Sequence, residues 1–193
     1  MPKVKFGFKN AYYSKIIVGT SGTISYATPV KLKGAVSITL APAGNEVEFY
    51  AEDGLYFSDS ANNGYDGDLE LAMIQEDFLK DILGEVEDSN NVLQESVTAS
   101  TSPFALLCEF TTDDGAKKFA FYNCTASRPE LSSKTKGESK EIQTEKLSIK
   151  IRPNADGLVK TSTKSDTTAS VISEWYSSVY IPTNSSNSDT PEV

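Results

Sequence analysis

The chain has 193 residues, a formal net charge of −9 and no histidine. This length suits one domain with a real core. The negative charge argues against nucleic-acid binding through clustered Lys and Arg. Without histidine, the chain lacks the commonest general base, transition-metal ligand and triad member. We therefore expect no enzyme activity, no cofactor and no bound metal.

The first part of the chain is predicted to contain a strand and an arm. Residues 6–18 are rich in the β-branched and aromatic types that favour a strand. Thr28-Pro29 keeps the following segment extended, which suits an edge or an arm better than a central strand. We therefore assign residues 1–33 to a first strand and an N-terminal arm, with residues 3–33 serving as the arm toward a neighbouring subunit.

Residues 36–52 are predicted to form a hairpin of two strands. Apolar and polar side chains alternate in residues 36–40, and a Pro- and Gly-containing turn follows. In the next strand Val47, Phe49 and Ala51 alternate with polar side chains, most of them glutamates. This pattern predicts one buried face and one acidic face turned outward.

A further strand and a helix are predicted between residues 66 and 84. Leu69 and Leu71 alternate with acidic residues, so one face of this strand is expected in the core. Residues 78–83 then carry apolar side chains at helical spacing, and Gly84 is placed to end the helix.

The strongest hairpin signal is Asp113-Asp114-Gly115, which lies between two apolar runs. Residues 104–111 and 117–125 are the predicted strands, and we expect this hairpin to be central. Alternation places Phe119 and Phe121 on the face opposite to Ala120, Tyr122 and Cys124.

The last third is predicted to add two strands, a helix and a tail. Residues 141–151 alternate, residues 158–161 are a short strand, and residues 171–179 carry the apolar face of a helix. Residues 1–181 are assigned to one domain, and residues 182–193 to a disordered tail. The predicted fold is mainly β, a sandwich or partly open barrel of antiparallel strands flanked by one or two short helices.

Two features of the sequence could be either a disulfide or metal site or ordinary structural elements. Cys108 and Cys124 could face each other across the hairpin, but spacing alone does not establish disulfide geometry, and two buried thiols are the simpler interpretation. Residues 59–70 partly match a calcium-binding loop. However, Ala61 occupies a ligand position and both flanks read as strand or extended chain, so we expect a turn there.

Several segments occur in a characteristic order. They read Thr28-Pro29-Val30-Lys31-Leu32-Lys33-Gly34-Ala35-Val36-Ser37-Ile38-Thr39-Leu40, Phe49-Tyr50-Ala51-Glu52-Asp53, Asn63-Gly64-Tyr65-Asp66-Gly67-Asp68-Leu69-Glu70, the helix from Phe78 to Gly84, Phe121-Tyr122-Asn123-Cys124-Thr125-Ala126-Ser127-Arg128-Pro129 and Ser133-Lys134-Thr135-Lys136. In this order the chain resembles the major tail tube protein of long-tailed (siphovirus-type) bacteriophages, in the branch common among phages of Gram-positive hosts. The resemblance covers most of the chain up to about residue 160.

The resemblance implies a structural virion protein. In that family the subunits form hexameric rings, sheets of neighbouring subunits join into a continuous inner barrel, and stacked rings make a hollow tube. Viral DNA would pass through without specific binding, and the other partners would be the tape measure protein and tail-end proteins. The location would be the virion tail, assembled in the host cytoplasm, with no membrane contact.

Three sets of interface residues follow as hypotheses. The loop that contacts the next ring would carry Tyr56, Phe57, Tyr65 and Asp66. The acidic face toward the lumen would carry Glu46, Glu48 and Glu52. A loop in contact with an adjacent subunit would carry Lys134, Lys136 and Lys140.

Two alternatives remain open at this level. Aromatic residues beside carboxylates, together with the partial calcium loop, would also suit a carbohydrate- or calcium-binding β-sandwich module. The second alternative is a tube protein of a phage-derived secretion particle, which would have the same fold but belong to a different particle.

Overall fold

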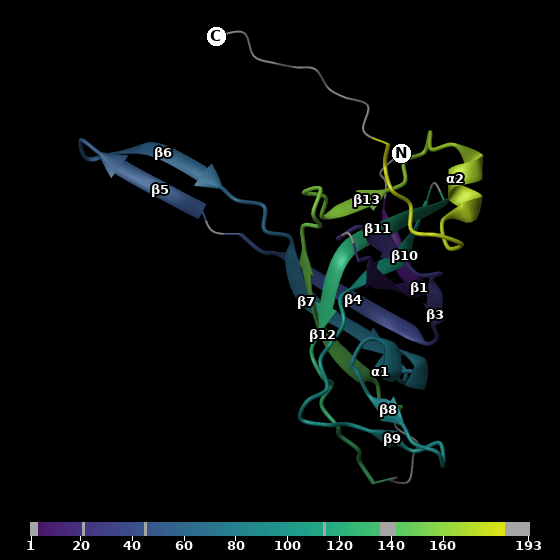
Figure 1. Cartoon of the computed structure of the whole chain (residues 1–193). Helices are drawn as coiled ribbons and strands as arrows, with labels where there is room; N and C mark the ends of the chain where they lie inside the picture. Colours follow the sequence, from purple (N-terminus) through teal and green to yellow (C-terminus); the bar gives the residue numbers. More distant parts are fainter. Residues whose placement is uncertain (1–3, 21, 45, 114, 136–141, 184–193) are drawn as a thin grey trace.

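The computed structural model describes residues 4–20, 22–44, 46–113, 115–135 and 142–183, without the side chains of residues 46, 47, 59 and 60. These residues form mainly antiparallel β structure with two short helices, as predicted (Figure 1). The strands are β1 (Lys5–Val18), β2 (Ile24–Tyr26), β3 (Val30–Leu32), β4 (Ala35–Pro42), β5 (Glu46–Ala51), β6 (Gly54–Ser60), β7 (Tyr65–Leu71), β8 (Val86–Glu87), β9 (Leu93–Gln94), β10 (Phe104–Thr112), β11 (Gly115–Ala126), β12 (Glu145–Arg152) and β13 (Lys160–Ser162). The helices are α1 (Glu76–Asp81) and α2 (Ala169–Glu174). Within the described ranges, no helix is long and apolar enough to cross a membrane.

One sheet holds nine of the strands and curls toward closure. Its order is β2-β1-β10-β11-β12-β7-β4, with β3 beside β1 and β13 beside β11. Strand β3 pairs with β1, and after only Lys33 and Gly34 the chain enters β4, which pairs with β7. The backbone N–H of Ala72 donates to the carbonyl of Gly34 at 2.7 Å, which holds this link against the end of β7. The two ends of the sheet are therefore joined by a tight turn, and the sheet surrounds a core.

The main core fills the inner face of the curled sheet. Its buried side chains come from strands far apart in sequence and include Tyr13, Leu32, Leu69, Leu71, Phe104, Leu106, Phe121, Leu147, Ile149 and Ile151. Helix α1 covers one end of this core with Phe78, which stacks edge-on against Tyr13 and Phe104 at ring distances of 5.1 and 5.4 Å. The predicted helix is confirmed, and Gly84 follows it at a φ of +77°.

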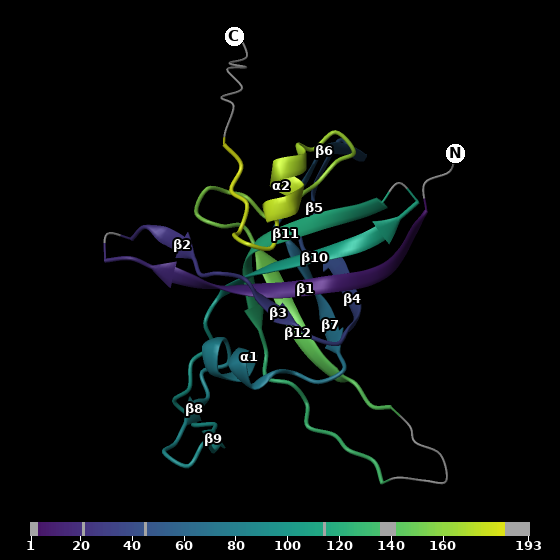
Figure 2. The same ribbon diagram turned by 90° about the vertical axis from the view of Figure 1, so that its right-hand side faces the viewer.

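A second core lies on the outer face of β10 and β11, under the C-terminal segment. Figure 2 shows α2 lying over these two strands, whereas α1 lies near β8 and β9. Trp175 and Val179 are buried against Leu107 and Tyr122, but they follow α2, which ends at Glu174, so the prediction that they lie on one helical face is wrong. The Tyr122 hydroxyl donates to the carbonyl of Tyr180 at 2.8 Å. The central hairpin is thus covered by apolar side chains on both faces.

A buried carboxylate ties the segment that follows α2 to the sheet. Glu109 on β10 is only 4% exposed, and it accepts a hydrogen bond from the Tyr176 hydroxyl at 2.9 Å. Lys9 Nζ lies 3.2 Å from its Oε1. Burial by itself raises the pKa of Glu109, but the hydrogen bonds from Tyr176 and Lys9 outweigh it, so the pKa of this carboxyl lies below its ordinary value.

We predict that Glu109→Gln lowers the free energy of unfolding by about 1–3 kcal/mol at pH 7, because it removes a buried charge that accepts two hydrogen bonds. A carboxyl with a lowered folded pKa stabilises the fold above its unfolded pKa and loses this contribution on acidification. The difference between variant and wild type should therefore shrink as the pH falls below about 4.3. Urea denaturation at pH 7 and pH 3 measures it, with Glu174→Gln at an exposed position of α2 as the control. A difference that is the same at both pH values would contradict the prediction.

Local irregularities interrupt the regular alternation of faces in β1 and β11. Strand β1 shifts register twice against β10, at Gly7 and at Asn10, whose φ angles are +73° and +53°. Strand β11 carries one extra residue, since Phe104 pairs with Cys124 but Leu106 pairs with Phe121. The bulge turns Cys124 into the main core, so the prediction that it shares a face with Tyr122 is wrong.

Two predicted arrangements differ from the structure. Strand β4 pairs with β7 and not with β5, so the predicted hairpin of residues 36–52 is wrong. Alternation sets the faces of a strand, but it does not identify the partner strand. Three strands of the predicted arm lie in the sheet, where β1 pairs with β10 and β2 and β3 fold back on β1. Contact of this segment with a neighbouring subunit stays a prediction.

Candidate functional site

The strands β5 and β6 form a hairpin that extends away from the body of the protein (Figure 1). At its base, the Ala43 N–H donates to the carbonyl of Gly64 and the Asn63 N–H donates to the carbonyl of Ala43, both at 2.8 Å. At its tip, Glu52 and Asp53 have φ angles of +51° and +60°. Positive φ at both central residues is typical of a two-residue type I′ turn, whose twist matches the flanking strands. The hairpin is therefore locally well formed although no layer of the domain covers it.

The hairpin exposes an unusual amount of apolar and aromatic surface. Tyr56 is 77% exposed, and the other large side chains are between 54% and 62% exposed, namely Phe49, Tyr50, Leu55 and Phe57. The rings of Phe49 and Tyr56 contact each other edge-on at 6.2 Å. A two-stranded hairpin alone is marginally stable in water, and exposed apolar patches of this kind mark interaction sites.

The hairpin is also strongly acidic. Between Gly34 and Leu79 the sequence contains no Lys or Arg. Glu48 accepts a hydrogen bond from the Tyr50 hydroxyl at 2.7 Å, so this carboxylate and this ring hold each other along the strand. The exposed surface of the hairpin therefore combines aromatic rings with uncompensated negative charge.

The structure separates the four residues of the predicted stacking loop. Tyr56 and Phe57 lie on β6 of the hairpin, whereas Tyr65 and Asp66 begin β7 in the main sheet. The Tyr65 ring packs edge-on against Phe121 at 6.4 Å, and its hydroxyl accepts a hydrogen bond from Lys160. Asp66 pairs with Arg152 at 2.7 Å. Tyr65 and Asp66 therefore also stabilise the sheet, and a stacking role stays a prediction for all four residues.

The acidic residues predicted for a lumen lie on or beside β5. Glu48 and Glu52 are exposed, and the side chain of Glu46 is outside the described set. The expected buried face of this strand is wrong, because Phe49 is 56% exposed. The pattern of one strand cannot tell whether a body of protein lies beneath it, and here the strand leaves the domain.

The predicted lysine loop is described only in part. Lys134 is exposed, and its backbone N–H donates to Gln143 Oε1 at 3.2 Å. Lys136 and Lys140 lie outside the described residues. Contact of these lysines with an adjacent subunit stays a prediction.

A polar face that sequence reasoning missed covers the outside of β4, β7 and β12. Glu70 accepts hydrogen bonds from the hydroxyls of Ser37 and Thr144, and these bonds lower its pKa. Asp68 accepts from the Ser148 hydroxyl at 2.8 Å. In the sequence, these residues are the polar positions that alternate with core positions in each strand. Only the pairing of the strands brings them together on one face.

The partial calcium loop does not wrap around a centre. Gly64 packs against the carbonyl of Ile151, and Tyr65–Leu71 is extended, so Glu70 lies about 20 Å further along β7. Among the described residues, no group of three Cys, Asp or Glu side chains could hold a metal ion. Cys108 and Cys124 are free and buried, and burial raises the pKa of Cys108 to about 12.

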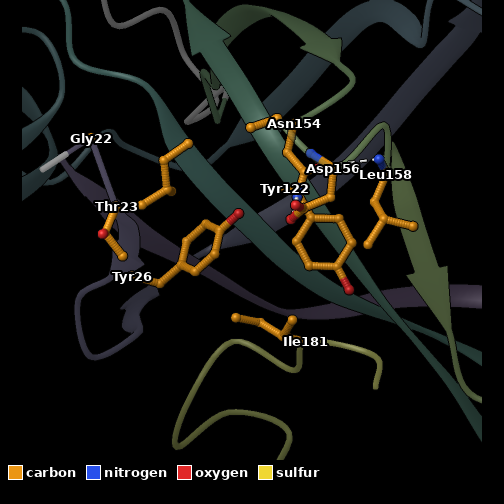
Figure 3. Close-up of a pocket in the computed structure, with 10 residues that line it drawn as sticks. Gly22, Thr23, Tyr26, Tyr122, Asn154, Asp156, Leu158 and Ile181 are labelled. Atoms are coloured by element: carbon orange, nitrogen blue, oxygen red, sulfur yellow. Dashed lines mark hydrogen bonds between the residues drawn. The ribbon is translucent and has the colours of Figure 1, made fainter. Parts of the chain in front are cut away.

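A pocket of about 290 Å³ lies between the β1–β2 turn, β11 and the turn before β13 (Figure 3). The rings of Tyr26 and Tyr122 line it, with centroids 6.3 Å apart. Burial raises the pKa of Tyr26, while Asn154 opposes this shift by hydrogen bonding.

Most polar groups around this pocket already have partners within the chain. Asn154 Oδ1 accepts hydrogen bonds from the backbone N–H groups of Asp156 and Leu158 at 3.0 and 2.8 Å. The Tyr122 hydroxyl lies 2.8 Å from the hydroxyl of Thr161. A ligand would therefore meet few free polar groups, and the arrangement suits a structural turn.

We predict that Tyr65→Ala lowers the free energy of unfolding by about 1–3 kcal/mol, because it removes a ring packed on Phe121. Tyr56→Ala should change it by less than about 0.5 kcal/mol, because that ring is exposed. Urea denaturation of both variants at low protein concentration provides the measurement. Equal losses in the two variants would contradict the different positions of these rings.

No protein-family model matches this sequence, and a search of curated proteins finds no match.

Proposed function

We propose that this chain is a self-assembling structural subunit, of the kind that forms the tail tube of long-tailed bacteriophages. The observation that carries the proposal is the β5–β6 hairpin. Its aromatic side chains are exposed, its charge is uniformly negative, and β5 and β6 pair only with each other among the described strands. A surface of this composition is costly in a monomer and becomes favourable when a partner covers it.

The edges of the main sheet support the same proposal. Strand β4 ends the sheet order, and within the described residues it has a partner on one side only. An open edge invites pairing with another chain, which is a hazard in solution and an advantage in a ring of identical subunits. Sheets of neighbouring subunits that join in this way would give the continuous inner barrel of a tube.

The electrostatics fit a conduit for DNA. With a net charge of −9, stacked rings would repel the phosphate backbone, so DNA would slide without persistent contacts. Hexameric rings, contact with a tape measure protein and tail-end proteins, and a place in the virion tail are parts of this proposal.

Electron microscopy of concentrated protein is the direct test, with sedimentation velocity for the mass in solution. We expect rings or hollow tubes of uniform diameter. The double variant Tyr56→Ala/Phe57→Ala should assemble at least about tenfold less well, because interface aromatics carry much of the binding energy. Val97→Ala is the matched control, since Val97 is fully exposed and lies outside the hairpin. Monomers under all conditions, or unchanged assembly of the double variant, would contradict the proposal.

A small-ligand module is the second candidate, and the pocket beside Tyr26 is the observation that favours it. Aromatic rings beside Asp156 could stack on a sugar ring. Calorimetric titration with simple sugars and with calcium separates the candidates. A tube subunit should bind neither, whereas binding that Tyr26→Ala abolishes would favour the module.

A further inference from the structure

A row of aromatic rings crosses the sheet at the margin of the main core. The members are contributed by β1, β10, β11 and β7, and we call them the aromatic row: Phe8, Phe110, Phe119, Phe121 and Tyr65. Successive ring centroids are 5.8, 5.1, 6.2 and 6.4 Å apart. Phe121 is buried, whereas Phe8, Phe110, Phe119 and Tyr65 are partly exposed, so the row presents aromatic edges to solvent on both sides of Phe121.

Three exposed lysines lie over this row. Lys5 Nζ is 4.8 Å from the centroid of Phe110, Lys117 Nζ is 5.4 Å from that of Phe119, and Lys160 Nζ is 4.5 Å from that of Tyr65. Within the described part of the chain, none of the three forms an ion pair with a carboxylate. The aromatic row therefore joins apolar surface to positive charge that the ring faces hold in place.

The β5–β6 hairpin is the chemical complement of this surface. Its fifteen positions from 46 to 60 contain five carboxylates and no Lys or Arg, and its aromatic side chains are exposed. Ring against ring and carboxylate against ammonium would cover both surfaces at once. We propose that the hairpin of one copy of this chain docks on the aromatic row of another copy.

The geometry favours a second copy over contact within one chain. The hairpin extends away from the sheet that carries the row, so it does not fold back on its own molecule (Figure 1). The projecting surface and the receiving surface belong to different parts of the chain. Such a contact is head-to-tail, and head-to-tail contacts generate closed rings or open filaments, not isolated pairs. This inference rests on the proposed self-assembly and names the surface that receives the hairpin.

Charge reversal with mixing tests the inference on the full-length chain. The row variant is Lys5→Glu/Lys117→Glu/Lys160→Glu, and the hairpin variant is Glu48→Lys/Glu52→Lys/Asp53→Lys, so that each surface changes the sign of its net charge. Each variant alone places like charges against each other, so its critical concentration for assembly should rise at least about tenfold. An equimolar mixture should assemble within about threefold of wild type, because each reversed surface then meets its complement. Lys146→Glu/Lys150→Glu/Lys164→Glu is the control, because these exposed lysines give the same charge change outside the row, the predicted arm and the predicted lysine loop.

Sedimentation velocity and electron microscopy read out the assembly, and thermal melts at low concentration confirm that every variant folds. Restoration by mixing supports the docking. If wild type forms tubes but the row variant does so equally well, or if the mixture is not restored, the row does not receive the hairpin and the proposed function still stands. If wild type never assembles, both proposals fail.

Discussion

The structure depends on the apolar character of both faces of the β10–β11 hairpin. Leu106 and Cys108 turn toward the main core, and Ala105 and Leu107 turn toward the second core. A strand pair that is apolar on both sides must be covered twice. The curled sheet with α1 covers the inner face, and the C-terminal segment with α2 covers the outer face. The buried Glu109 then fixes the segment that follows α2 through the Tyr176 hydroxyl and Lys9.

The β5–β6 hairpin lies outside this arrangement, and its large apolar side chains stay exposed. Tyr56 and Phe57 are large side chains of the kind that fill a core, yet they are exposed. Exposed aromatic rings on a well-formed hairpin are explained if another molecule buries them. The same explanation applies to the row of half-exposed rings under Lys117 and its neighbours. The hairpin and the aromatic row are opposite in charge and both expose aromatic rings, and the proposed docking rests on this complementarity.

The reactive groups of the described residues are arranged for stability. The thiols of Cys108 and Cys124 are buried, and burial raises the pKa of both, so neither is a ready nucleophile. Glu70 and Asp68 are held by serine and threonine hydroxyls on neighbouring strands. The polar atoms of Asn154 close a turn. Each group contributes hydrogen bonds or packing to the fold.

The sequence by itself determined the local features, because they depend on neighbours in the chain. Alternation placed Leu147, Ile149 and Ile151 in the core, and the turn at residues 113–115 identified the central hairpin. Tertiary structure decided which strands pair and what lies beneath each face. Strand β4 pairs with β7, a bulge moves Cys124 to the other face, and the alternating β5 has no core under it. These outcomes depend on contacts between strands that are distant in sequence. The alternation within one strand does not show which strand pairs with it or what packs on its faces.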